Sequence, residues 1–268
     1  VKPPYGAAEM DRGHPLSRGI FRSWLANERV GPAHDPINRN DGTLTAGAFW
    51  ARDPALSFDG VDDYVEVPNR AGVFTLVDSW TVAAWVQPLA TVSWPLGPIV
   101  WKTARNGYND DTFALAWNGP ARSFFAKLER AADDTDFDVY SAPHPTELWY
   151  HIAAVYDGST LGVYVNGIME NSQNIGAVTA YTGPAPLRIG NNLNSLHGPR
   201  GVFDGTIDQV RIWNVARTAE QLLANMNVAH VGNEHGLVGS WSFNEPQGSQ
   251  IALDLSPSCN DGQLGSTP

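Results

Sequence analysis

The sequence has a single cysteine, Cys259, among its 268 residues. One cysteine cannot form an intrachain disulfide, so stability must come from a hydrophobic core, which a chain of this length can bury. The surrounding segment, Pro257-Ser-Cys-Asn-Asp-Gly262, is typical of a turn and contains no pattern that would activate a nucleophilic thiol. The scarcity of cysteine excludes a disulfide scaffold and argues against thiol catalysis.

Positive charge is also scarce, because 17 basic side chains face 28 acidic ones and the formal net charge is −11. Phosphate binding needs clustered lysine and arginine, and no long basic run is present. No apolar run is long enough to cross a bilayer, and Val1-Lys-Pro-Pro-Tyr5 lacks the apolar core of a signal peptide. We therefore expect no nucleic-acid partner, no membrane partner, and neither a signal peptide nor a transmembrane segment in this chain.

Glycine, proline and tryptophan are plentiful, at 26, 19 and 10 residues, and they separate many short apolar segments. Trp80–Gln87 is apolar on both faces of a period-two pattern, which predicts a strand covered on both sides. Asn166-Gly167 is a strong hairpin signal. Thr218 and Gln221 have capping-box spacing and predict one short helix near 218–226. The fold class predicted is all-β, an antiparallel β-sandwich with this single helix.

A faint internal repeat joins the two ends of the sequence. Gly19–Glu28 matches Gly236–Glu245, with Trp24 aligned to Trp241, and each copy is followed by Asn-Asp-Gly, at 40–42 and 260–262. The second copy is either a strand of the same sandwich or the opening of a second domain. We favour the first alternative, with an extended N-terminal arm at 1–18, a main domain at 19–226 and an extension at 227–268 that packs on it.

Four segments resemble, in the correct order, blocks of the laminin-G-like jelly roll in the concanavalin-A-like lectin and glucanase superfamily. They are Ala55–Pro68, Trp149–Asp157, Leu161–Gly167 and Gly205–Leu222. The resemblance implies a jelly-roll sandwich that serves mainly for recognition. The first residues, including Lys2-Pro-Pro-Tyr-Gly6, also resemble the N-termini of such domains in bacteriophage structural proteins.

Glycanases with this fold need two nearby carboxylates on one strand, a nucleophile and an acid. The expected Glu-x-Asp-x-x-Glu strand is missing, and the acidic pair Asp62 and Glu66 belongs to an early strand instead. His151 lies in an apolar strand and is interpreted as a core histidine. We therefore predict that the protein is not an enzyme and has no catalytic residues.

The resemblance also implies a structural calcium ion, which prefers several hard oxygen ligands. In similar sandwiches the aspartate of the last signature strand, here Asp208, often ligates calcium. An acid near a terminus, Glu28 or Glu245, and a glycine turn, Asp59-Gly60, would complete the site. The alternative is that Asp208 only accepts hydrogen bonds from backbone amides.

Sugar recognition requires an aromatic platform beside amides or carboxylates, because rings cover the apolar face of a pyranose while polar groups bind its hydroxyls. Loop residues of these types are the predicted ligand-binding residues. They are Trp94, Tyr108, Asn109, Asp110, Asp111, Tyr181, Asn191, Asn192, Asn194 and His197. The segment 106–111 is also rich enough in oxygen atoms for calcium, although its residues are equally those of an ordinary turn.

Three functional hypotheses follow. The favoured one is a non-catalytic module that binds carbohydrate or surface glycan and holds structural calcium, in an extracellular or virion setting. The alternative is a virion structural or decoration protein that attaches to capsid or tail proteins, or to itself, through the jelly roll and a proline-rich arm (Pro3, Pro4). A glycanase is the least favoured.

Overall fold

The computed structural model describes residues 55–89, 96–105, 110–192, 201–228, 232–245 and 249–265. The predicted N-terminal arm and the first copy of the repeat lie outside these ranges. Six predicted site residues also lie outside them: Glu28, Trp94, Tyr108, Asn109, Asn194 and His197. No helix in the described part has the length and hydropathy that a bilayer crossing requires.

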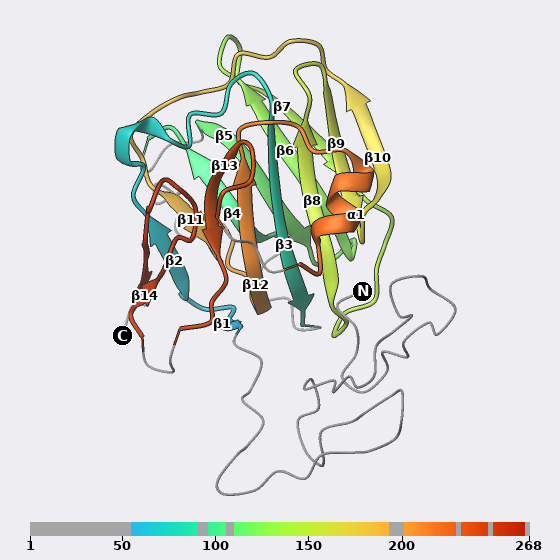
Figure 1. The fold of residues 1–268 in the computed structure, drawn as a ribbon. Coiled ribbons are helices and arrows are strands. Elements are labelled where there is room, and N and C mark those ends of the chain that lie inside the picture. The colour runs from blue at the N-terminus through green and yellow to red at the C-terminus, as the bar shows by residue number, and fades with distance from the viewer. Residues whose placement is uncertain are drawn as a thin grey trace, which may run out of the picture. The chain divides into compact units, whose positions relative to one another are not determined.

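Two antiparallel sheets form a sandwich, which confirms the predicted fold class (Figure 1). The order in the seven-stranded sheet is β1 (Leu56–Asp59), β12 (Asp204–Trp213), β3 (Trp80–Pro88), β8 (Tyr150–Tyr156), β9 (Thr160–Val165) and β10 (Ile168–Asn174), with β13 (Leu237–Trp241) also paired to β12. The order in the eight-stranded sheet is β14 (Ile251–Ala252), β15 (Gly262–Gly265), β2 (Tyr64–Val67), β11 (Leu187–Ile189), β4 (Leu96–Thr103), β5 (Asp111–Asn118), β6 (Ser123–Arg130) and β7 (Thr135–Tyr140). A 3-10 turn, η2 (Arg70–Gly72), follows β2.

The core lies between the sheets and follows the period-two pattern of the strands. In β3, Trp80, Val82 and Val86 are fully buried in this core. The alternate residue Ala83 is equally buried, but it packs with Leu222 on the other side of the sheet. The prediction that this strand is covered on both faces is therefore confirmed.

The helix α1 (Ala219–Asn225) covers the outer face of the seven-stranded sheet (Figure 1). It begins with the predicted capping box, in which Thr218 Oγ1 accepts from the Gln221 N–H and Gln221 Oε1 accepts from the Thr218 N–H. Under its C-terminal end, the Trp85 indole N–H donates to the Met226 carbonyl at 2.7 Å. His151 is buried and packs edge-on against Trp85, as expected of a core histidine.

Two predicted turns have the backbone conformations that their residues favour. Asn166 and Gly167 connect β9 to β10 with φ of 52° and 80°, in the left-handed region that these residues tolerate. Cys259 lies between β14 and β15 with φ of 48°, and it is an exposed free thiol.

The second copy of the repeat contributes to both sheets, because β13 pairs with β12 and β15 pairs with β2. Trp241 is fully buried, and its indole N–H donates to the Asn260 carbonyl at 3.2 Å. The buried Asp254 carboxylate accepts backbone N–H groups of Ser240, Ser256 and Asn260 at 2.8 to 2.9 Å. The residues that define this copy are thus tied together by hydrogen bonds within it.

Candidate functional site

One outer face of the sandwich, that of the eight-stranded sheet, carries a cluster of charged side chains. In β6, Phe124, Ala126 and Leu128 belong to the core. Their alternate neighbours point to the other side of the eight-stranded sheet, because successive strand residues face opposite ways. We call this side the outer sheet face, formed by outward residues of β4 to β7: Trp101, Thr103, Asp111, Ala114, Ala116, Phe125, Lys127, Glu129, Asp136, Asp138 and Tyr140.

The middle of the outer sheet face is apolar and aromatic. Trp101 packs with Ala114, Ala116 and Phe125 in a buried cluster that is separate from the core. Phe125 also packs against Tyr140, with ring centroids 5.0 Å apart, and Tyr140 is 38% exposed. Trp101 and Phe125 are buried, so Tyr140 is the exposed ring of this group.

Lys127 lies at the centre of the charged groups and is only 6% exposed. Its ammonium group forms an ion pair with Asp136 and lies 3.8 Å from both Asp111 Oδ2 and Asp138 Oδ1. Burial alone would lower the pKa of Lys127, but these three carboxylates outweigh burial and raise it. The lysine is therefore protonated at neutral pH, and its charge is shared among the three acids.

Asp111 and Glu129 are the most deeply buried carboxylates of the outer sheet face. The Asp111 backbone N–H donates to Glu129 Oε2 at 2.8 Å, and the Trp101 indole N–H donates to Asp111 Oδ1 at 2.7 Å. Burial raises the pKa of Asp111 to about 6 and that of Glu129 to about 7, although Lys127 acts in the opposite direction on both. Both acids therefore titrate close to neutral pH.

Three predicted ligand-binding residues, Asp110, Asp111 and Tyr181, gather at one end of this face. Asp110 forms an ion pair with Arg105. The Tyr181 hydroxyl donates to Asp134, and this bond raises the pKa of Tyr181 to about 12. A backbone bridge between residues 130 and 180 brings the Tyr181 segment to the end of β6, and the charge of Asp110 also acts on the Tyr181 hydroxyl.

Two other predicted residues, Asn191 and Asn192, lie near the opposite end of β4. The pairing of Ile189 with Val100 sets this placement, and the eight residues of β4 span about 23 Å. Both asparagines are more than nine-tenths buried, and neither side-chain amide oxygen has a hydrogen-bond partner. The structure thus divides the predicted ligand-binding residues that it describes into two groups.

Sequence reasoning missed Trp101, Thr103, Lys127, Glu129 and Asp138 as site residues. Thr103 is 1% exposed, pairs opposite Asp111, and its hydroxyl has no hydrogen-bond partner. A signal was present in the sequence, because polar residues alternate with apolar ones along β6 and β7. The sequence could not show that these residues lie near Asp111, because their proximity depends on the register between three strands.

The predicted glycine element of the calcium site lies in the turn between β1 and β2. The carboxylate groups of Asp59, Asp62 and Asp63 each offer an oxygen atom, and these atoms lie within 4.8 Å of one another. A Cβ on Gly60, whose φ is 73°, would come within 2.9 Å of Asp204 Cβ, so a fourth acid borders the turn. Hard oxygen donors in this number fit calcium.

Asp208 is placed away from that turn, and Glu245 forms a hydrogen bond within the C-terminal segment. The register aligns Asp59 with Asp204, whereas Asp208 lies opposite Trp85 and is 2% exposed. Four residues along β12 separate Asp208 from Asp204 by roughly 13 Å. Glu245 Oε1 accepts the Leu253 N–H at 2.8 Å. The strand pairing therefore does not join Asp208 to Asp59-Gly60 in one set of ligands, which corrects the predicted arrangement.

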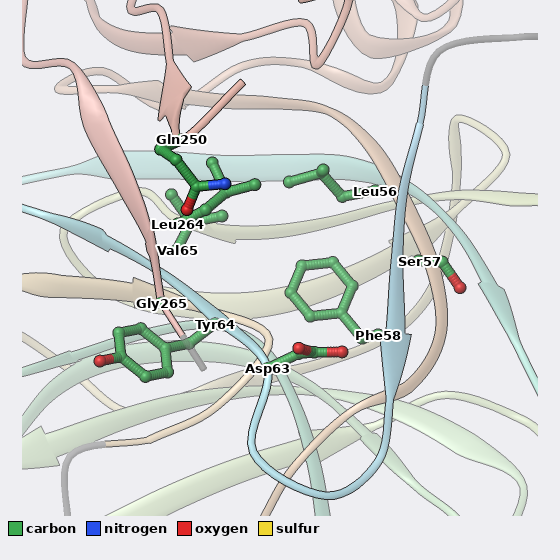
Figure 2. Close-up of a pocket in the computed structure, with 9 residues that line it drawn as sticks. All are labelled: Leu56, Ser57, Phe58, Asp63, Tyr64, Val65, Gln250, Leu264 and Gly265. Atoms are coloured by element: carbon green, nitrogen blue, oxygen red, sulfur yellow. The ribbon is translucent and has the colours of Figure 1, made fainter. Parts of the chain in front are cut away.

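A pocket of about 180 Å³ lies beside the same turn, between β1, β2 and β15 (Figure 2). Leu56, Phe58 and Leu264 give it an apolar lining, and Figure 2 shows the carboxylate of Asp63 at its border. Burial raises the pKa of Asp63; the Asp59 backbone N–H opposes this effect, while the nearby charges of Asp59 and Asp62 add to it. The pocket therefore combines an apolar lining with one acidic group.

Comparison with known proteins identifies the class. The family model described as the concanavalin A-like lectin/glucanases superfamily, of the laminin-G type, matches residues 59–223. The chain belongs to this superfamily, as its four signature blocks predicted.

Among curated proteins, mouse and human pappalysin-1 are each 30% identical over 114 residues. The match covers 41% of this chain but only 7% of pappalysin-1. The chain therefore resembles one small part of a much larger protein.

Three solved structures share the fold. A Bacteroides ovatus protein assigned as carbohydrate-binding is 20% identical, with a TM-score of 0.60, over 88% of this chain and 66% of its own. A heptameric pentraxin from Limulus polyphemus is 18% identical, with a TM-score of 0.53, over 78% and 97%. The carbohydrate-binding module of a Ruminococcus gnavus sialidase, bound to α2,3-sialyllactose, is 12% identical, with a TM-score of 0.52, over 63% and 96%.

Proposed function

We propose that the protein is a non-catalytic glycan-binding module and that the outer sheet face is its binding site. The observation that carries this proposal is the group formed on one face by the exposed ring of Tyr140, the carboxylates around Lys127 and the buried, unpartnered hydroxyl of Thr103. Aromatic rings provide the apolar surface that a pyranose covers, while the carboxylate and hydroxyl groups accept hydrogen bonds from sugar hydroxyls. Tyr140 and Tyr181 add partly exposed rings at the margins.

The known relatives support a recognition role at the level of the fold. The neighbours of known structure include modules described as carbohydrate-binding, one of them with a bound sialyl sugar. Fold similarity at these identities raises the probability of sugar binding without locating a site. The location therefore rests on the side chains of the outer sheet face.

The carboxylates of this face are arranged for binding rather than for hydrolysis. A retaining glycanase needs one carboxylate free to act as a nucleophile and a second free to act as an acid. Here Lys127 holds Asp111, Asp136 and Asp138 around one ammonium group, and Glu129 accepts the Asp111 backbone N–H. These internal pairs support a module without catalytic residues.

The proposal is tested by replacing an exposed ring of the outer sheet face. Tyr140→Ala removes the ring that packs on Phe125, and we expect glycan affinity to fall about tenfold, equivalent to ~1.4 kcal/mol. Tyr164→Ala is the matched control, because Tyr164 packs beside the cluster on the opposite outer face. Isothermal titration with a glycan selected on an array measures both variants. Equal affinity of wild type and Tyr140→Ala would contradict the proposed location.

Structural calcium is a second part of the proposal, favoured by the close carboxylates of Asp59, Asp62 and Asp63. Bound calcium would hold the turn between β1 and β2 and stabilise the folded state by mass action. We expect calcium to raise the unfolding temperature of the wild type but not of Asp62→Asn, with Asp78→Asn as the control. An unfolding temperature that is the same in calcium and in a chelator would contradict it.

The alternative role in a virion rests on the N-terminal residues, which lie outside the described part of the chain. Attachment to capsid or tail proteins, self-association, and a virion or extracellular location therefore stay predictions.

A further inference from the structure

The cations of the outer sheet face are already engaged by acids of the same chain. Lys127 is enclosed by three carboxylates, and Arg105 forms an ion pair with Asp110. An anionic ligand would have to displace one of these carboxylates to pair with either cation. In the buried environment of Lys127 such a displacement would leave an acid without its counter-charge, which is costly.

The outer sheet face holds buried polar atoms that lack a hydrogen-bond partner and can accept a hydrogen bond. The Thr103 hydroxyl can either accept or donate. One unpartnered donor, Arg188 Nε, lies opposite Trp101 on β11, and its guanidinium group is already paired with Glu66. Asp138 Oδ1 has no hydrogen bond either, since its separation of 3.8 Å from Lys127 Nζ is beyond hydrogen-bond length. A ligand that satisfies these atoms must therefore present hydrogen-bond donors.

The net charge of the outer sheet face also disfavours an anionic ligand. Beside Lys127 and Arg105, the described residues of the face and its end carry the acids Asp110, Asp111, Glu129, Asp134, Asp136 and Asp138, while Arg130 at that end is paired with Asp133. Charges within a few Å of one another at a partly buried site are screened less by salt than exposed charges are. A sugar bearing a carboxylate or sulfate would meet repulsion here that a neutral sugar would not.

We propose that the outer sheet face selects uncharged, hydroxyl-rich glycans and rejects glycans that carry carboxylate or sulfate groups. This inference rests on the proposed function and adds the class of ligand. The expected ligand differs from that of the sialidase module that shares this fold, because that module was solved with a sialylated sugar.

The experiment uses an array of paired glycans, each neutral oligosaccharide beside its sialylated or sulfated counterpart, at pH 8. Isothermal titration then compares the best-bound neutral glycan with its acidic counterpart. We expect the neutral member to bind at least tenfold more tightly. Asp136→Asn removes one acid whose side chain is half exposed, and it should narrow this ratio about threefold. Asp78→Asn changes the net charge equally at an exposed loop and should leave the ratio unchanged.

The outcomes distinguish the inference from the function on which it rests. Acidic glycans that bind as tightly as their neutral counterparts would overturn the inference and leave glycan binding intact. Ratios that shift equally in Asp136→Asn and Asp78→Asn would also overturn it, because selection would then come from overall charge. Binding to no glycan would overturn the proposed function itself.

Discussion

The outer faces of the two sheets are built from similar residue types but satisfy their polar groups in different ways. On the seven-stranded sheet, Arg211 donates to the carbonyls of Asn225 and Val228, and Trp85 donates to the carbonyl of Met226. On the eight-stranded sheet, Trp101 donates to a carboxylate, and that carboxylate faces a lysine. The chain's own helix covers the outer face of the seven-stranded sheet. On the outer sheet face, the polar side chains instead pair with one another.

This difference separates a structural face from the face that we propose for recognition. Main-chain carbonyls at the end of α1 fix Arg211 and Trp85, so these side chains cannot reach a ligand without loss of the helix contact. Burial lowers the pKa of Arg211 to about 10, so it remains charged at neutral pH. On the outer sheet face, the Thr103 hydroxyl is left without a partner, and such buried groups in native proteins call for an explanation such as a ligand or water.

The largest expected effect comes from removing the central cation of the outer sheet face. Lys127→Met leaves the buried Asp111 without its counter-charge, and we expect the free energy of unfolding to fall by about 3 kcal/mol at pH 8. Chemical denaturation at a series of pH values measures this change.

The pH dependence of Lys127→Met follows from the acids that remain. The folded pKa values of Asp111 and Glu129 are above their unfolded values, so the native state binds more protons between about pH 4 and 7. Their contribution to stability therefore falls as pH rises through this window. We expect Lys127→Met to recover most of its lost stability at pH 5, and a loss that is independent of pH would contradict the charge network.

A smaller effect is expected on the opposite face. Arg211→Met removes the donors to Asn225 and Val228 but keeps much of the side-chain volume, and we expect a loss of about 2 kcal/mol. The charges of Glu234 and Asp208 also act on Arg211, so part of the loss should recover at pH 5, but less than in Lys127→Met because Arg211 donates mainly to main-chain carbonyls. Recovery at pH 5 equal to that of Lys127→Met would show that the two faces do not differ as described.

The smallest effect on stability is expected at Thr103. Thr103→Val keeps the shape of the side chain and removes a buried hydroxyl without a partner, so stability should stay unchanged or rise by up to about 1 kcal/mol. Glycan affinity should nevertheless fall, because the hydroxyl is assigned to the ligand. A clear loss of stability with unchanged affinity would assign Thr103 a structural role only.

Local sequence signals predicted the fold well, whereas the site depended on strand register. The capping box at Thr218 and the turn at Asn166-Gly167 each involve neighbouring residues, so the sequence alone specifies them. Asp111 and Lys127 meet only because β5 and β6 pair in one register. The same kind of long-range pairing aligns Asp59 with Asp204 rather than Asp208, and no local pattern contains that information.

The indole N–H signals of the tryptophans test the central claim most directly. Trp101 and Trp85 each donate an indole N–H at 2.7 Å, on opposite outer faces of the sandwich. Trp101→Phe and Trp85→Phe assign the two signals in a nitrogen-15 correlation spectrum, into which the best-bound neutral glycan is titrated. The account predicts that the Trp101 signal shifts with saturation while the Trp85 signal stays in place. A shift of Trp85 alone, or of neither signal while the glycan binds, would contradict it.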